Sequence, residues 1–136
     1  MNYYPDTNIC IYFLKGISTN INLKLQQANP DNIKIPSIVK AELLFGAEKS
    51  NRRKQNIELV SKFLLPLEII SFDNRAAEVY ATVRASLEKK GEVIGPNDLI
   101  IASIVLANNG TLVTNNPKEF NRIGKLKVIN FKIQKF

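Results

Sequence analysis

GPNDLIIASIVLANNGTLVT, residues 95–114, is the stretch that decides the fold class. After the Gly95-Pro96 turn, residues 99–107 are apolar on every side of a helix, which is typical of a helix buried in the centre of a domain. The short apolar run at residues 111–114 then predicts a strand. A buried helix followed by a strand indicates an α/β layer structure.

The same alternation of strand and helix patterns extends outward along the chain. Apolar runs predict strands at residues 2–5, 33–35, 67–71, 111–114 and 127–131. Helical spacing predicts helices at residues 8–14, 20–27, 37–50, 54–64, 74–90 and 97–108. Strands that alternate with helices predict an α/β fold with a mainly parallel sheet. Since no repeat, low-complexity tract or linker interrupts the pattern, we expect one domain over residues 1–136.

The composition is that of a basic globular protein. The 136 residues include 19 Lys and Arg and 12 Asp and Glu, for a formal charge of +7. This excess favours a polyanionic partner such as nucleic acid, although many basic proteins of this size bind nothing specific. No apolar run reaches the roughly 18 residues that would span a bilayer, and no basic segment precedes the apolar stretch 9–14. We therefore expect a cytoplasmic protein without a membrane segment.

Two absences narrow the chemistry. The chain has no histidine and a single cysteine, Cys10, which its apolar neighbours indicate to be a small buried hydrophobe. This excludes a His-assisted serine or cysteine triad, a histidine-based ribonuclease mechanism and an ordinary zinc site. Any catalysis must therefore use carboxylates, hydroxyls, amides, lysines or a metal ion.

Three carboxylates occupy unusual positions. On a helical wheel at about 100° per residue, Glu42 interrupts the apolar arc of the helix at residues 37–50. Such an acid needs a metal, a donor cluster or a cation, and an internal salt bridge is the simpler alternative. Asp98 stands at the mouth of the buried helix, and Asp6 directly follows the first strand. Either of these could instead be an ordinary acid at a helix start.

Because open α/β sheets bind ligands beyond the carboxyl ends of their strands, we expect these groups to converge at one edge. The other acids lie in polar surroundings and are assigned to surface, turn and cap positions: Asp31, Glu48, Glu58, Glu68, Asp73, Glu78, Glu88 and Glu92. An acid cluster without His or Cys is a hard oxygen ligand set that suits Mg²⁺ or Mn²⁺. A bound divalent cation would activate water beside a phosphate.

Two basic clusters are candidates for phosphate contacts. The first comprises Lys49, Arg52, Arg53 and Lys54, and the second comprises Lys118, Arg122, Lys125 and Lys127. A solvated charged face is at least as good an interpretation of the first cluster. Phosphoryl transfer by a nucleotide-binding protein is disfavoured, since no glycine-rich phosphate loop follows any predicted strand.

Four motifs resemble those of PIN-domain nucleases, in the same order along the chain. These are YPDTNICIY at residues 4–12, SIVKAELLFGA at 37–47, GPNDLIIA at 95–102 and LVTNNPKEF at 112–120. Each motif alone is weak, but four in this order at these intervals are strong evidence, and the resemblance extends over nearly the whole chain. The short length is similar to that of VapC-type toxins of toxin-antitoxin pairs.

The resemblance implies a three-layer α/β/α sandwich and Mg²⁺- or Mn²⁺-dependent endonucleolytic cleavage of RNA, with tRNA among the candidate substrates. Carried over, Asp6 and Asp98 are the main metal ligands, and Glu42 is a further ligand or a water-positioning acid. It also implies inhibition by a cognate antitoxin and assembly as a homodimer or as a toxin-antitoxin hetero-oligomer. A catalytically silent RNA-binding or interaction module is the alternative.

The chain departs from the family pattern at two positions. Many relatives have an aspartate where Asn116 stands, so Glu119 is the nearest acid able to complete the catalytic set. Pro5 stands where relatives usually carry an aliphatic residue, and it removes a backbone N–H from a central strand. The expected donors that orient the carboxylates are Thr7, Asn8, Thr114 and Asn116.

Overall fold

A computed structural model describes residues 1–17 and 19–131 of the chain. The strands are β1 (Tyr3–Pro5), β2 (Lys34–Pro36), β3 (Glu68–Ile70), β4 (Thr111–Thr114) and β5 (Lys127–Asn130). The helices are α1 (Thr7–Lys15), α2 (Thr19–Gln27), α3 (Ser37–Glu48), α4 (Arg53–Leu64), α5 (Asn74–Lys90) and α6 (Pro96–Ala107). Short 3-10 turns occupy Pro30–Asn32 and Phe120–Arg122.

All strand pairings of the described chain are parallel. One sheet has the order β1-β4-β5, and β2 pairs with β3. A parallel bridge between Tyr3 and Ile33 joins the two parts, so the strands follow the order β3-β2-β1-β4-β5. From β1 the chain first moves outward to β2 and β3 and then returns to the other side of β1. The switch point therefore lies between the carboxyl ends of β1 and β4, where α/β sheets place their ligands.

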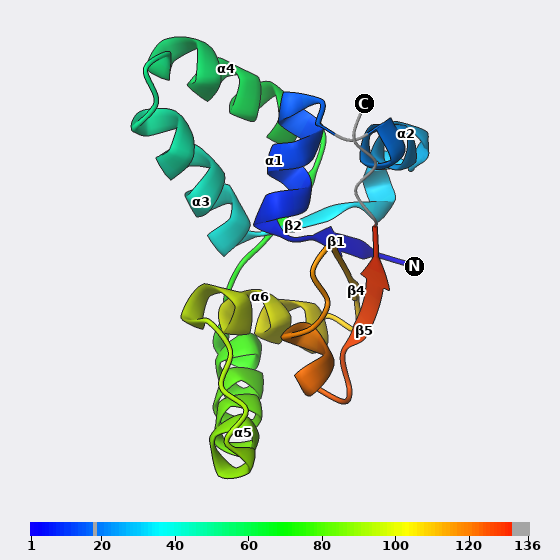
Figure 1. Ribbon diagram of the computed structural model, residues 1–136, viewed down its shortest axis with the longest axis vertical. Helices are drawn as coiled ribbons and strands as arrows, with labels where there is room; N and C mark the ends of the chain where they lie inside the picture. Colours follow the sequence, from blue (N-terminus) through cyan, green and yellow to red (C-terminus); the bar gives the residue numbers. More distant parts are fainter. Residues whose placement is uncertain (18, 132–136) are drawn as a thin grey trace.

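Helices cover the sheet in two layers (Figure 1). Helices α1 to α4 lie on one side of the strands, and the α5–α6 pair lies on the other. The predicted α/β/α arrangement with a mainly parallel sheet is confirmed. The N-terminal ends of α3 and α6 approach each other from opposite layers at the edge where β1 ends.

The predicted elements are all present, with bounds shifted by one or two residues. Asp73 caps α5 by accepting a hydrogen bond from the backbone N–H of Ala76, and Gly91 ends that helix in the left-handed conformation at φ 70°. Both features follow from the sequence. The helix predicted to run to residue 50 ends at Glu48, because the chain turns there toward α4.

The core is continuous from α6 to the sheet. Ile101, Ile104 and Val105 of α6 are fully or almost fully buried, as is Cys10, and burial raises the pKa of the Cys10 thiol. A Cβ on Gly110 would lie 2.2 Å from Cε1 of Tyr4, so only glycine allows β4 to start against this ring. No described helix is long and apolar enough to cross a membrane.

Pro5 is tolerated because its nitrogen, which carries no hydrogen, faces β2 and not β4. The backbone N–H of Asp6 donates to the carbonyl of Val113 in β4 at 2.9 Å. Since successive N–H groups of a strand point to opposite sides, the nitrogen of Pro5 faces β2. On that side the described strands share only the Tyr3–Ile33 bridge. The proline thus leaves the β1–β4 pairing that holds Asp6 intact and accounts for the weak pairing with β2.

Candidate functional site

Asp6 lies at the switch point and is 6% exposed. Its backbone is fixed by β4, and its carboxylate accepts a hydrogen bond of 2.9 Å from the backbone N–H of Ile9, which caps α1. Burial raises the pKa of Asp6, hydrogen bonds from Thr114 and Ile9 lower it, and the charge of Glu42 raises it further. The helix-start interpretation is therefore confirmed, and the same carboxylate also faces a second acid.

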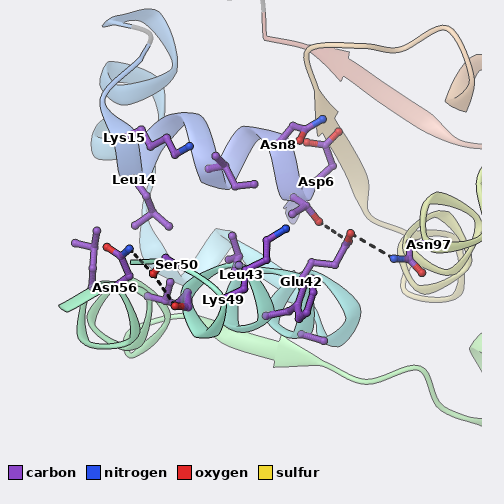
Figure 2. Close-up of a pocket in the computed structure, with 18 of the residues that line it drawn as sticks. Asp6, Asn8, Leu14, Lys15, Glu42, Leu43, Lys49, Ser50, Asn56 and Asn97 are labelled. Carbon is purple, nitrogen blue, oxygen red and sulfur yellow. Dashed lines mark hydrogen bonds between the residues drawn. The ribbon is translucent and has the colours of Figure 1, made fainter. Parts of the chain in front are cut away.

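Glu42 reaches the same place from α3 (Figure 2). Its Oε1 accepts a hydrogen bond of 2.6 Å from the Thr7 hydroxyl, and its Oε2 accepts one of 3.3 Å from the Asn97 amide. Both donors are neutral, and no Lys or Arg of the described chain pairs with Glu42. The internal salt bridge that the sequence left open is absent there.

The sequence placed Glu42 inside an apolar arc of α3, but in the structure only one side of that arc is buried. Val39 and Leu43, which belong to this arc, are buried, whereas Phe45, also in the arc, is 64% exposed. Glu42 consequently stands at the boundary between the core face of α3 and an open groove, instead of facing the core itself.

Asp98 lies in the first turn of α6 and contacts Glu119, which follows β4. The pKa of Asp98 is raised to about 6, first by burial, then by the hydrogen bond and charge of Glu119, and then by the charges of Asp6 and Glu42. The four acids thus come from four separate segments and influence one another. This convergence supports the predicted set Asp6, Glu42, Asp98 and Glu119.

The predicted orienting groups take different positions. Thr114 is buried, bonds to the carboxylate of Asp6 and accepts a hydrogen bond of 3.1 Å from the backbone N–H of Asn116. Thr7 bonds to Glu42, and the exposed Asn8 lines the groove and contributes a backbone hydrogen bond to Asp6. The side chain of Asn116 is exposed, so its backbone and not its amide contributes the described contact.

A groove of about 920 Å³ runs from the acids along α1, α3 and α4. Figure 2 shows Asp6, Glu42 and Asn97 at one end and Lys15, Ser50 and Asn56 toward the other. The middle of the groove is apolar, with Ile11 and Leu43 among its lining residues. The groove therefore begins at Asp6, Glu42 and Asp98 and continues between α1, α3 and α4.

The predicted basic residues do not form one surface at the acids. Lys49 lines the groove, while Arg53 makes an ion pair of 2.6 Å with Glu48 on the exposed turn between α3 and α4. Arg52, Lys54 and Lys118 are exposed and do not line the groove. The solvated-face interpretation fits Arg53, whose charge Glu48 already offsets.

The donor set fits a hard divalent cation. All four acids supply oxygen, and the charges of Glu119, Asp6 and Glu42 each raise the pKa of Asp98, so the four carboxylates interact electrostatically. Within residues 1–17 and 19–131, no three His, Cys, Asp or Glu side chains already form a metal cage. Mg²⁺ needs none, since it keeps several waters and binds through one or two carboxylates.

Sequence reasoning missed Asn97, which the structure places against Glu42. Its position directly before Asp98 was the one available signal. A polar residue at the start of a helix has several ordinary uses, so the motif alone did not identify its contact with α3.

Fold and site together define a class of α/β proteins that collect acids at the switch point of a parallel sheet. The family model of the PIN domain matches residues 3–126. The chain belongs to the PIN-domain family.

Curated relatives and solved structures agree with this assignment. Ribonuclease VapC2 of Rickettsia felis is 46% identical over 133 residues, covering 96% of this chain and 98% of the relative. The tRNA(fMet)-specific endonuclease VapC of Salmonella typhimurium is 34% identical, covering 94% of this chain and 96% of the relative. The crystal structure of VapBC2 from Rickettsia felis bound to a promoter DNA fragment superposes with a TM-score of 0.88 at 45% identity, covering 97% and 100% of the two chains.

Proposed function

We propose that this chain is a Mg²⁺- or Mn²⁺-dependent endoribonuclease, acting as a single PIN-like domain over residues 1–136. The observation that carries the proposal is the convergence of four acids from separate segments with no Lys or Arg of the described chain paired to any of them. The chain has a formal charge of +7, yet within its described residues no Lys or Arg forms an ion pair with these acids, which leaves their charge to be offset by a cation from solution.

In this proposal the acids hold the metal and position the reactants. Asp6 and Asp98 are the main ligands, and Glu42 is a further ligand or holds the attacking water through its carboxylate, whose Oε1 is oriented by Thr7 and whose Oε2 is oriented by Asn97. When bound, the cation supplies Lewis-acid polarisation of the phosphate and lowers the pKa of water. Cleavage in line would leave a 5′-phosphate and a 3′-hydroxyl.

Glu119 takes the part that an aspartate at position 116 has in many relatives. Its hydrogen bond to Asp98 and the exposure of the Asn116 side chain support this substitution of one acid for another. Thr114 bonds to Asp6 and keeps its carboxylate aimed at the shared space.

Purified wild type and Asp98→Asn, incubated with total cellular RNA with and without Mg²⁺, test the proposal. We expect wild type to cleave only with the metal, EDTA to stop it, and the variant to lose at least about 100-fold in rate while its melting temperature in Mg²⁺-free buffer stays at or above that of wild type. Glu78→Gln on the exposed face of α5 is the matched control. RNA binding without cleavage by wild type would instead identify a catalytically silent binding module.

The relatives indicate the partners to test. VapC of Salmonella typhimurium is named a tRNA(fMet)-specific endonuclease, so tRNA is the first substrate to examine. The solved VapBC complexes support a cognate antitoxin that blocks the site, with assembly as a homodimer or hetero-oligomer in the cytoplasm. Co-purification with the adjacent-gene product, followed by loss of RNA cleavage, checks this inference.

A further inference from the structure

We propose that Phe45 and Lys49 form a nucleotide subsite beside the cleavage site, in which Phe45 stacks on an RNA base and Lys49 contacts the neighbouring phosphate. The inference rests on the proposed ribonuclease function and specifies how the substrate lies in the groove. It concerns single-stranded RNA, since only an unpaired base offers its face to a side chain.

The first observation is the exposure of Phe45. This ring is 64% exposed on α3 although Val39 and Leu43 on the same helix are buried. It lines the groove that also contains Asp6, Glu42 and Asp98. A large aromatic face open to solvent inside a charged groove is the chemistry of a base-stacking platform.

The second observation is the spacing along α3. Glu42, Phe45 and Lys49 stand at positions i, i+3 and i+7, which lie on one face of a helix. At 1.5 Å per residue, Phe45 is about 4.5 Å and Lys49 about 10 Å from Glu42 along the helix axis. An acid for the metal, a ring and a cation therefore follow one another in a row.

The third observation is that Lys49 is available. Its Nζ lies 5.1 Å from the centroid of the Phe45 ring, and no acid of the described chain forms a salt bridge with it. Lys15 stands on the opposite wall, on α1, and also lines the groove (Figure 2). Lysines on both walls of the groove are complementary to a phosphate backbone that lies in it.

A peptide is the competing occupant, because the middle of the groove is apolar. The two ligands differ in what they require at position 45. A base needs an aromatic face, whereas an apolar peptide side chain packs equally well on leucine. The pairing of the ring with an unpartnered lysine favours the base.

The test compares Phe45→Leu, Phe45→Tyr and Lys49→Gln on a short single-stranded RNA that contains one mapped cleavage site. We expect Phe45→Leu to raise KM at least about 5-fold, since stacking on one base contributes about 1–3 kcal/mol. Phe45→Tyr should recover most of that loss, and Lys49→Gln should raise KM and reduce its dependence on salt. Phe72→Leu, at a partly exposed aromatic that does not line the groove, is the matched control.

Abasic substitution locates the stacked base. The base is removed from the RNA at each position next to the cleavage site in turn. For wild type, KM should rise at one position only, and for Phe45→Leu the abasic RNA at that position should cause no further rise in KM. Equal KM values for wild type and the folded Phe45→Leu variant, or an abasic effect of the same size in both, would overturn the subsite. If wild type binds this RNA without cleaving it, the ribonuclease proposal fails, and fluorescence anisotropy on the same variants still decides the subsite.

Discussion

Acids on the surface of this protein and acids at the end of β1 differ in the charge of their hydrogen-bonding partners. Glu48, Glu68 and Glu88 each form an ion pair with a Lys or Arg at 2.6 to 3.2 Å. Asp6 and Glu42 instead receive hydrogen bonds from neutral groups and face other carboxylates. The surface pairs are complete without any ligand, whereas the acids at the end of β1 have no cationic partner within the described chain.

The largest effect is expected for Asp6→Asn. Asparagine still caps α1 by accepting the hydrogen bond from the N–H of Ile9, so the fold is retained while the negative charge is lost. RNA cleavage in Mg²⁺ should fall at least about 100-fold, measured as an initial rate on a defined RNA. The paired surface acid in Glu48→Gln should leave the rate unchanged. Equal losses in both variants would remove the distinction between the two kinds of acid.

A smaller effect is expected for Thr114→Val. This change keeps the shape of a buried side chain and removes the hydroxyl whose hydrogen bond lowers the pKa of Asp6. The activity should fall about 10-fold and the acid limb of its pH profile should move to higher pH. Thr114→Ser, which keeps the hydroxyl, should restore the position of that limb. A pH profile identical in Thr114→Val and wild type would show that neutral donors do not tune the site.

The metal-free protein should become less stable as pH rises through about 6. The folded pKa of Asp98 is about 6, above about 3.9 for an unfolded aspartate, so between these values the folded state holds a proton that the unfolded state has lost. The melting temperature in EDTA should therefore fall between pH 4.5 and 7, and Asp98→Asn should remove most of that fall. Excess Mg²⁺ at pH 7 should raise the melting temperature of wild type. A melting temperature that does not respond to Mg²⁺ would contradict the proposed metal site.

The smallest effect is expected for Glu68→Gln. The Lys34–Glu68 pair of 2.7 Å joins β2 and β3 at an edge where the Glu68 side chain is 61% exposed. Exposed pairs contribute about 0–1 kcal/mol, so the free energy of unfolding in urea should change by no more than that. The RNA cleavage rate should stay at the wild-type value. A larger loss would mean that this surface pair supports the sheet beyond its own charge interaction.

The sequence predicted the layers and three of the acids because their signals are local. The apolar residues on all sides of α6 identify a buried helix, and Glu42 stands out against its apolar neighbours Val39 and Leu43. The exposure of Phe45 and the contact of Asn97 with Glu42 were not predictable in this way. The Asn97–Glu42 contact depends on how α6 packs near α3, and the exposure of Phe45 depends on the groove between α3, α1 and α4. Both are contacts between distant segments, which the residue spacing within one helix cannot predict.

The near-absence of pairing between β1 and β2 has a mechanical consequence. The backbone of Asp6 is held by β4, whereas Glu42 belongs to the helix that follows β2. The two acids therefore lie on opposite sides of the boundary between β1 and β2, which in the described strands is bridged only between Tyr3 and Ile33. Segments with few backbone hydrogen bonds open at the lowest free energy. The Thr7–Glu42 hydrogen bond joins α1, which follows β1, to α3, which follows β2, and so adds a side-chain link where the backbone pairing is sparse.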